Sequence, residues 1–186
     1  MPIQALMSAF GLVFITEIGD KTMLTTMCLS AQYRQPAIIL IAAMSALAIA
    51  STIAVITGVI LAVAIPIEFI VYVSGALFVA MGIHTLVKND PDPDDCKQPT
   101  TFMSMVSLVL FSELGDKSQI AILALAVQST FPILIFVGAM AGFLIVNLIG
   151  AYAGDRVAEK VPVSTIRKAT GIIFIAFGIL VLAGFI

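Results

Sequence analysis

The sequence has few charged side chains and few histidine and cysteine residues. Of its 186 residues only 11% are charged and 61% are hydrophobic, whereas soluble domains have about 25% and about 45–50%. Tryptophan is absent, and there is one histidine. The two cysteines are too few for a disulfide framework. So few charges cannot supply the polar surface of a soluble protein, and a net charge of −2 gives no indication of a nucleic-acid partner. The composition therefore predicts a protein of the lipid bilayer.

Long apolar runs also indicate a membrane protein, and they predict the fold class. A run of about 18 or more apolar residues can cross a hydrocarbon core as a helix. The first run has no basic n-region or cleavage site, so we expect a retained helix rather than a signal peptide. The sequence thus predicts an all-α polytopic membrane protein with six transmembrane helices, approximately at residues 3–31, 36–65, 66–87, 101–128, 132–154 and 164–186.

The two halves of the chain are copies of each other. With a constant offset of 96 residues, LVFITEIGDKTMLTTMCLSAQ at 12–32 lies over LVLFSELGDKSQIAILALAVQ at 108–128. Each copy has three predicted spans, an odd number, so the second copy must enter the membrane from the opposite side. We expect two inverted three-helix repeats, at 1–87 and 100–186, joined by an acidic linker at 88–99. Such repeats place transporter sites near the bilayer midplane.

The distribution of basic residues predicts the orientation. Seven Lys and Arg residues lie in the connections after the first, third and fifth runs or in the first turns of the run that follows, whereas the other face has none. By the positive-inside rule, the linker is expected in the cytoplasm and both termini outside. The basic residues are Arg34, Lys88, Lys97, Arg156, Lys160, Arg167 and Lys168.

Six ionisable residues lie well inside the first and fourth runs. They form two copies of one motif: Glu17, Asp20 and Lys21 in EIGDKT, and Glu113, Asp116 and Lys117 in ELGDKS. Each would cost about 2.5–3.5 kcal/mol at the centre of a membrane helix. On a continuous helix the three side chains of each motif would share one face. The glycine inside each motif permits either close helix approach or a local unwinding.

The charges of the two motifs do not cancel. A structural clip, in which each Glu pairs with the Lys four residues later, leaves one carboxylate of each motif uncompensated. The six groups together carry −2 if all are ionised. One divalent cation or two protons would neutralise this charge, and a site that accepts either has the thermodynamic basis of an exchanger.

Two E-x-G-D-K-[TS] motifs in six spans with an acidic linker resemble the family of small cation/proton exchangers that includes bacterial manganese exporters and the Golgi calcium/manganese exchangers. The resemblance covers essentially the whole chain. It implies export of Mn²⁺, with Ca²⁺ as a further candidate, across a bacterial inner (plasma) membrane, with Glu17, Asp20, Glu113 and Asp116 as the metal-binding acids. Many relatives have Arg in place of Lys117 and an aromatic residue in place of Met23.

Residues next to the acids are candidates for additional ligands. Carboxylate, hydroxyl and carbonyl oxygens suit Mg²⁺, Ca²⁺ and Mn²⁺ alike. The thioether of Met23 would favour Mn²⁺, although most methionines fill gaps in a packed core. Its repeat mate Gln119 offers an amide oxygen. Thr22 and Ser118 either ligate the ion or bond back to their own helix carbonyls.

Other polar and small residues have weaker expectations. Asn147 either reaches the site or bonds a neighbouring helix. Lys21 and Lys117 either tune the acids or act as internal counter-ions in one state. His84, the only histidine, is expected at the membrane interface rather than in the site. Four glycines, seven residues apart within each copy, are expected at close helix contacts or hinges: Gly75, Gly82, Gly171 and Gly178.

The sequence therefore predicts alternating access around a four-carboxylate site, with a divalent cation and protons as the transported ions and no cofactor. It leaves the oligomeric state open. An exporter of small organic cations or amino acids would need an apolar or aromatic pocket, and few aromatic residues flank the motifs. A non-transporting scaffold would not explain the duplicated acids. An enzyme is the least favoured alternative, because no nucleophile and base pair is evident.

Overall fold

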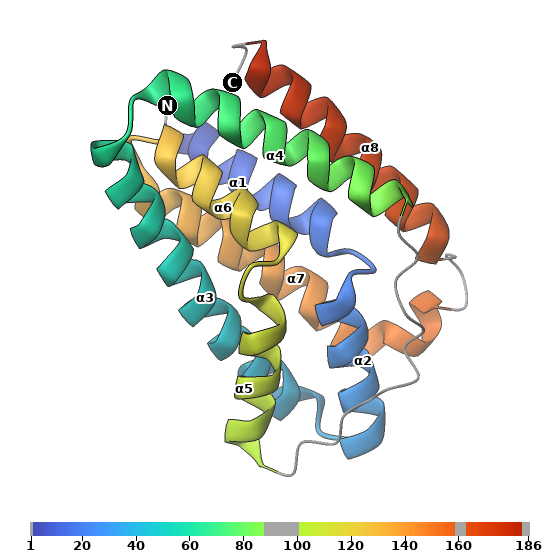
Figure 1. Cartoon of the computed structure of the whole chain (residues 1–186). Coiled ribbons are helices and arrows are strands. Elements are labelled where there is room, and N and C mark those ends of the chain that lie inside the picture. Colours follow the sequence, from blue (N-terminus) through green and yellow to red (C-terminus); the bar gives the residue numbers. More distant parts are fainter. Residues whose placement is uncertain (1, 88–100, 159–162, 184–186) are drawn as a thin grey trace.

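A computed structural model describes residues 2–87, 101–158 and 163–183 of the chain (Figure 1). Within these ranges the regular structure is entirely helical, which confirms the predicted all-α class. The acidic linker at 88–99 lies outside the described residues. The helices are α1 (Pro2–Glu17), α2 (Lys21–Tyr33), α3 (Pro36–Ala64), α4 (Ile67–Val87), α5 (Phe102–Glu113), α6 (Lys117–Gln128), α7 (Pro132–Ala158) and α8 (Val163–Leu182).

The helix bounds follow the sequence repeat. α1 ends at Glu17 and α5 ends at its repeat mate Glu113, and α3 and α7 both begin at a proline, Pro36 and Pro132. A proline in the first turn lacks only an N–H that would have no helical acceptor there. α1, α2, α3 and α4 therefore correspond in order to α5, α6, α7 and α8.

The first and fourth apolar runs are each broken into two helices at the motif. Gly19 has a φ of 72° and Gly115 a φ of 86°, a left-handed backbone that glycine adopts without the steric penalty of a side chain. The same turn closes both breaks: the N–H of Asp20 donates to the Glu17 carbonyl, and that of Asp116 donates to the Glu113 carbonyl. Of the two roles that the sequence allowed for these glycines, the structure shows local unwinding.

The described helices include clear candidates for membrane spans. α3 is long and apolar enough to cross a bilayer alone, and so is the segment Pro132–Tyr152 of α7. α1 and α2 qualify as a third span if they are taken as one segment bent by 62°. The remaining three spans, and so the total of six, stay a prediction.

Glycines bring α4 and α8 into close antiparallel contact. A Cβ on Gly75 would lie 3.1 Å from the carbonyl oxygen of Gly178, and one on Gly82 would lie 2.7 Å from that of Gly171. The order of these pairs is reversed along the two helices, so α4 and α8 run in opposite directions (Figure 1). The expected role of these four glycines in close helix contact is confirmed.

Most of the other helix contacts also connect the two halves of the chain. α1 packs along α7, where a Cβ on Gly138 would lie 2.3 Å from the Leu6 carbonyl oxygen. The corresponding pair also packs together: α5, the repeat mate of α1, lies against α3, the repeat mate of α7, with Ala46 and Val109 in a shared buried cluster. These contacts hold the broken ends of α1 and α5 inside the bundle.

Candidate cation-binding site

All four acids of the motifs lie at the helix breaks. Glu17 and Glu113 are the last residues of α1 and α5, and their side chains are 0% and 1% exposed. Asp20 and Asp116 are the N-cap residues of α2 and α6, but neither side chain caps its own helix. The expectation that each motif occupies one face of a continuous helix is wrong, because the left-handed glycine redirects the chain between the Glu and the Asp.

Acids from both motifs converge. One carboxylate oxygen from each of Glu17, Asp20 and Asp116 lies within 4.8 Å of the others. Glu113 is linked to the first motif differently, because its Oε1 accepts a hydrogen bond from the Thr22 hydroxyl. The structure thus brings three of the four predicted acids into one cluster, which we call the carboxylate cluster, and connects the fourth to its edge.

An ion pair joins the two motifs at the carboxylate cluster. Nζ of Lys117 lies 3.5 Å from Oδ1 of Asp20, so the lysine of the second motif pairs with an acid of the first. This contact differs from the clip within one motif that the Glu and Lys spacing would allow. The side chain of Lys21, the corresponding residue of the first motif, lies outside the described part of the structure.

Glu17 has little local compensation for its burial. Neither of its carboxylate oxygens has a well-formed hydrogen bond to the described residues. The Ser118 hydroxyl lies close enough to interact with this carboxylate, but it does not meet hydrogen-bond geometry. A buried carboxylate in this state is costly unless it binds a cation or a proton.

The remaining candidate ligands next to the acids differ in their contacts. Thr22 donates to Glu113 instead of bonding back to its own helix. Ser118 and both amide atoms of Gln119 are buried and have no hydrogen bond within the described structure. Sδ of Met23 lies 3.3 Å from the Gly19 nitrogen and accepts its N–H, which places the thioether at the break beside Asp20.

Asn147 binds a neighbouring helix rather than the acids. Its Oδ1 accepts a hydrogen bond of 2.8 Å from Thr26, and its Nδ2 donates to the Phe143 carbonyl oxygen. Sequence reasoning did not select Thr26. The one available signal was its position four residues after Thr22, on the same face of α2.

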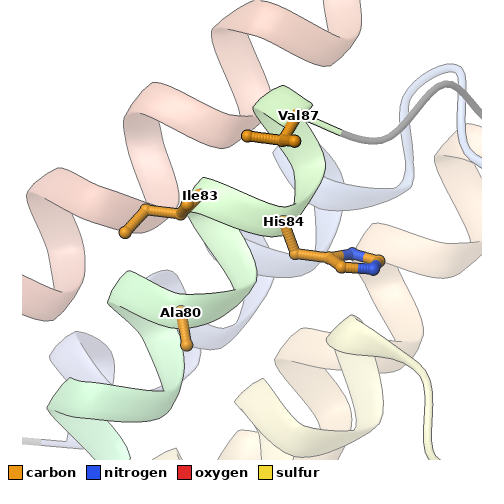
Figure 2. A pocket seen from close by; sticks show the side chains of 4 residues that line it. All are labelled: Ala80, Ile83, His84 and Val87. Atoms are coloured by element: carbon orange, nitrogen blue, oxygen red, sulfur yellow. The ribbon is translucent and has the colours of Figure 1, made fainter.

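His84 lies away from these groups, in the last turn of α4. It lines an open hollow of about 420 Å³ together with Ala80, Ile83 and Val87, all from the same helix (Figure 2). None of the acids of the motifs lines this hollow. The described structure therefore gives His84 no contact with the carboxylate cluster.

The arrangement is suited to a hard divalent cation. Oxygen atoms from three carboxylates are close enough to share one ion. The buried side chains of Thr22, Ser118 and Gln119 follow the two aspartates within three residues. Asp20 and Asp116 lie at the N-termini of α2 and α6. The helix dipoles there stabilise the negative charge of these carboxylates when no cation is bound. Broken helices that meet at a charged site are characteristic of secondary transporters.

Comparison with known proteins defines the class more narrowly. The family model described as "Divalent cation/proton antiporter GDT1" matches residues 5–93 and 101–185. The chain belongs to this family of divalent cation/proton antiporters, which are transporters rather than enzymes. The family resemblance inferred from the doubled motif is confirmed.

Individual relatives come from bacteria and plants. The chain is 28% identical over 180 residues to a Vibrio cholerae protein named "Putative manganese exporter", with 94% of this chain and 90% of that protein covered. It is 28% identical to the rice "GDT1-like protein 2, chloroplastic" and 25% identical to the Arabidopsis thaliana "Protein PAM71-homolog, chloroplastic". These matches cover 92% and 91% of this chain, but only 59% and 56% of the plant proteins. No solved structure matches the chain.

Proposed function

We propose that the protein exports Mn²⁺ from the cytoplasm in exchange for protons, with Ca²⁺ as a second transported ion. The observation that carries this proposal is the convergence of Glu17, Asp20 and Asp116 from two broken helices within 4.8 Å. Glu113 completes the site when its hydrogen bond with Thr22 rearranges. Cytoplasmic Mn²⁺ displaces protons from the acids, and external protons later displace the metal.

The transport cycle rests on the two repeats. We propose six spans in inverted repeats at 1–87 and 100–186, with the 88–99 linker cytoplasmic and both termini outside, in a bacterial inner membrane. The antiparallel contact of α4 with α8 supports this arrangement, because inverted repeats require it. Rocking of one repeat against the other would then open the site alternately to the two sides.

Uptake of metal into everted membrane vesicles tests this function. Vesicles with the wild-type protein should accumulate Mn²⁺ when a proton gradient is imposed, and a protonophore should abolish the accumulation. Glu113→Gln and Asp116→Asn should each remove it while expression is retained. Ser45→Ala is a matched control, because the Ser45 hydroxyl bonds the Ile41 carbonyl of its own helix at 2.7 Å.

The outcomes separate the alternatives. Normal uptake by both acid variants would refute the shared carboxylate site. Uptake of lysine but of no divalent cation would favour an exporter of organic cations. If none of Mn²⁺, Ca²⁺, Mg²⁺ and lysine is transported, a scaffold is favoured. Metal uptake that does not depend on the proton gradient would favour a channel.

A further inference from the structure

One face of α2 carries a row of buried hydroxyl groups that starts at the carboxylate cluster. Thr22, Thr26 and Ser30 are four residues apart, and their side chains are 2%, 1% and 6% exposed. At 1.5 Å per residue the row extends about 12 Å along the helix. It runs from the Glu113 contact of Thr22 to the last turn of α2, next to the connection with α3.

The groups of this row are not used in the packing of their own helix. The Thr26 hydroxyl donates to Oδ1 of Asn147 on α7 at 2.8 Å. The Ser30 hydroxyl has no hydrogen-bond partner in the described structure. By contrast, Thr52 on α3 bonds back to its own Ala48 carbonyl at 2.7 Å, as hydroxyls in membrane helices often do.

The repeat mates of these residues do not form such a row. Thr26 and Ser30 correspond to Ile122 and Ala126 of α6, both buried and apolar. On that side α6 packs closely on α3, where a Cβ on Gly58 would lie 2.9 Å from the Cβ of Ala126. The polar row is therefore a property of the first repeat only.

We propose that the hydroxyl row of α2, completed by Asn147, is the path along which the divalent cation moves between the carboxylate cluster and the end of the bundle where α2 meets α3. This inference rests on the proposed export function. Neutral hydroxyl and amide oxygens replace part of the hydration shell of an ion without trapping it, as carbonyl oxygens do in channels. In the proposed topology this end of α2, which is capped by Arg34, faces the cytoplasm.

The Thr26–Asn147 hydrogen bond closes the path in this structure. The Thr26 hydroxyl and the Asn147 amide oxygen are hydrogen-bonded to each other while α2 and α7 are in contact. A small separation of the two helices breaks this bond and presents two oxygen atoms to the ion. Thr26, Asn147 and Ser30 are thus positioning residues for ion passage, and they are distinct from the carboxylates that hold the ion.

Two variants test the path without changing the carboxylates. In everted vesicles at limiting Mn²⁺, Thr26→Val and Ser30→Ala should each slow initial uptake about tenfold, while the equilibrium affinity of the purified protein for Mn²⁺ stays within about twofold. Thr26→Ser should restore the rate, because it retains the hydroxyl. Thr52→Val is the matched control and should transport at the wild-type rate.

Ser30→Ala is the decisive variant, because Ser30 makes no hydrogen bond whose loss would destabilise the fold. Wild-type uptake rates for Ser30→Ala and Thr26→Val would overturn the path, and so would a loss of equilibrium affinity that matches the loss of rate. If the wild-type protein transports no divalent cation, the proposed function itself fails and the path fails with it.

Discussion

Lys117 of the second motif pairs with Asp20 of the first, with Nζ and Oδ1 3.5 Å apart. The pair crosses between the repeats, so the ammonium group lies at the carboxylate cluster where a cation would bind. A bound metal ion must therefore share Asp20 with Lys117 or displace it. We therefore propose that Lys117 acts as an internal counter-ion of the metal-free state.

Removal of the Lys117 charge should strengthen metal binding. In Lys117→Gln the ammonium no longer competes for Asp20, so the affinity for Mn²⁺ should rise about two- to fivefold, the size expected for a partly exposed ion pair. Lys117→Arg keeps the charge and should bind like the wild type. Isothermal titration of the purified variants measures both values. Weaker binding by Lys117→Gln would show that the lysine does not compete with the cation.

Glu17→Gln should stabilise the metal-free protein. The Glu17 carboxylate is fully buried without a well-formed hydrogen bond, and a neutral amide of the same shape is less costly to bury. We expect the midpoint of thermal unfolding at neutral pH to rise by about 2–4 °C, while the stabilisation by Mn²⁺ disappears. Glu113→Gln should gain less, because Glu113 accepts a bond from Thr22. A lower midpoint for Glu17→Gln would contradict this account.

The break in the second motif depends on the backbone of Gly115. A Cβ at this position would meet no atom within 4 Å, so a substitution there acts through the φ of +86° alone. Gly115→Ala should destabilise the protein by about 1–2 kcal/mol and reduce transport. Gly115→Asn should be tolerated better, because asparagine adopts the left-handed conformation more readily. Unfolding curves of the two variants provide the comparison, and equal stability of both would oppose a requirement for this turn.

Met23 is predicted to contribute to selectivity for Mn²⁺. Its Sδ already accepts the Gly19 N–H, so it would have to exchange this contact for the metal. Met23→Leu should lower the preference for Mn²⁺ over Ca²⁺ by about tenfold at most, because only one weak ligand is lost. Met44→Leu, a change at a partly buried residue that packs against the hydrophobic core, is the control. The assay is Mn²⁺ uptake against excess Ca²⁺, and an unchanged inhibition curve would assign Met23 to packing.

Most of the fold follows from patterns that are local in the sequence. The apolar runs and the prolines at the starts of α3 and α7 predict α3, α4, α7 and α8 to within a few residues, whereas each of the other two runs contains two helices in place of the one expected. The sequence does not decide the role of Gly19, because a glycine at this position permits either a close helix contact or a left-handed turn. Only the backbone conformation, with φ at 72°, distinguishes the two.

The contacts of the site could be predicted less well. Residue spacing shows only which groups lie near each other along one helix, so it allows a Glu–Lys pair within each motif but indicates no contact between the motifs. The Lys117–Asp20 and Thr26–Asn147 contacts join residues that are 97 and 121 positions apart in the sequence. They depend on the packing of α2 against the second repeat. The four acids were selected by their burial cost, a property that a single sequence reveals.

Coupled fluxes in reconstituted liposomes test the central claim most directly. Mn²⁺ and proton movements should be recorded together, with an outward or inward Mn²⁺ gradient as the only driving force. Because protons and metal compete for the same carboxylates, a Mn²⁺ gradient should drive protons in the opposite direction, and lowering the pH should weaken Mn²⁺ binding. Glu17→Gln liposomes should show neither flux. Mn²⁺ transport by the wild-type protein without any proton movement would contradict the account.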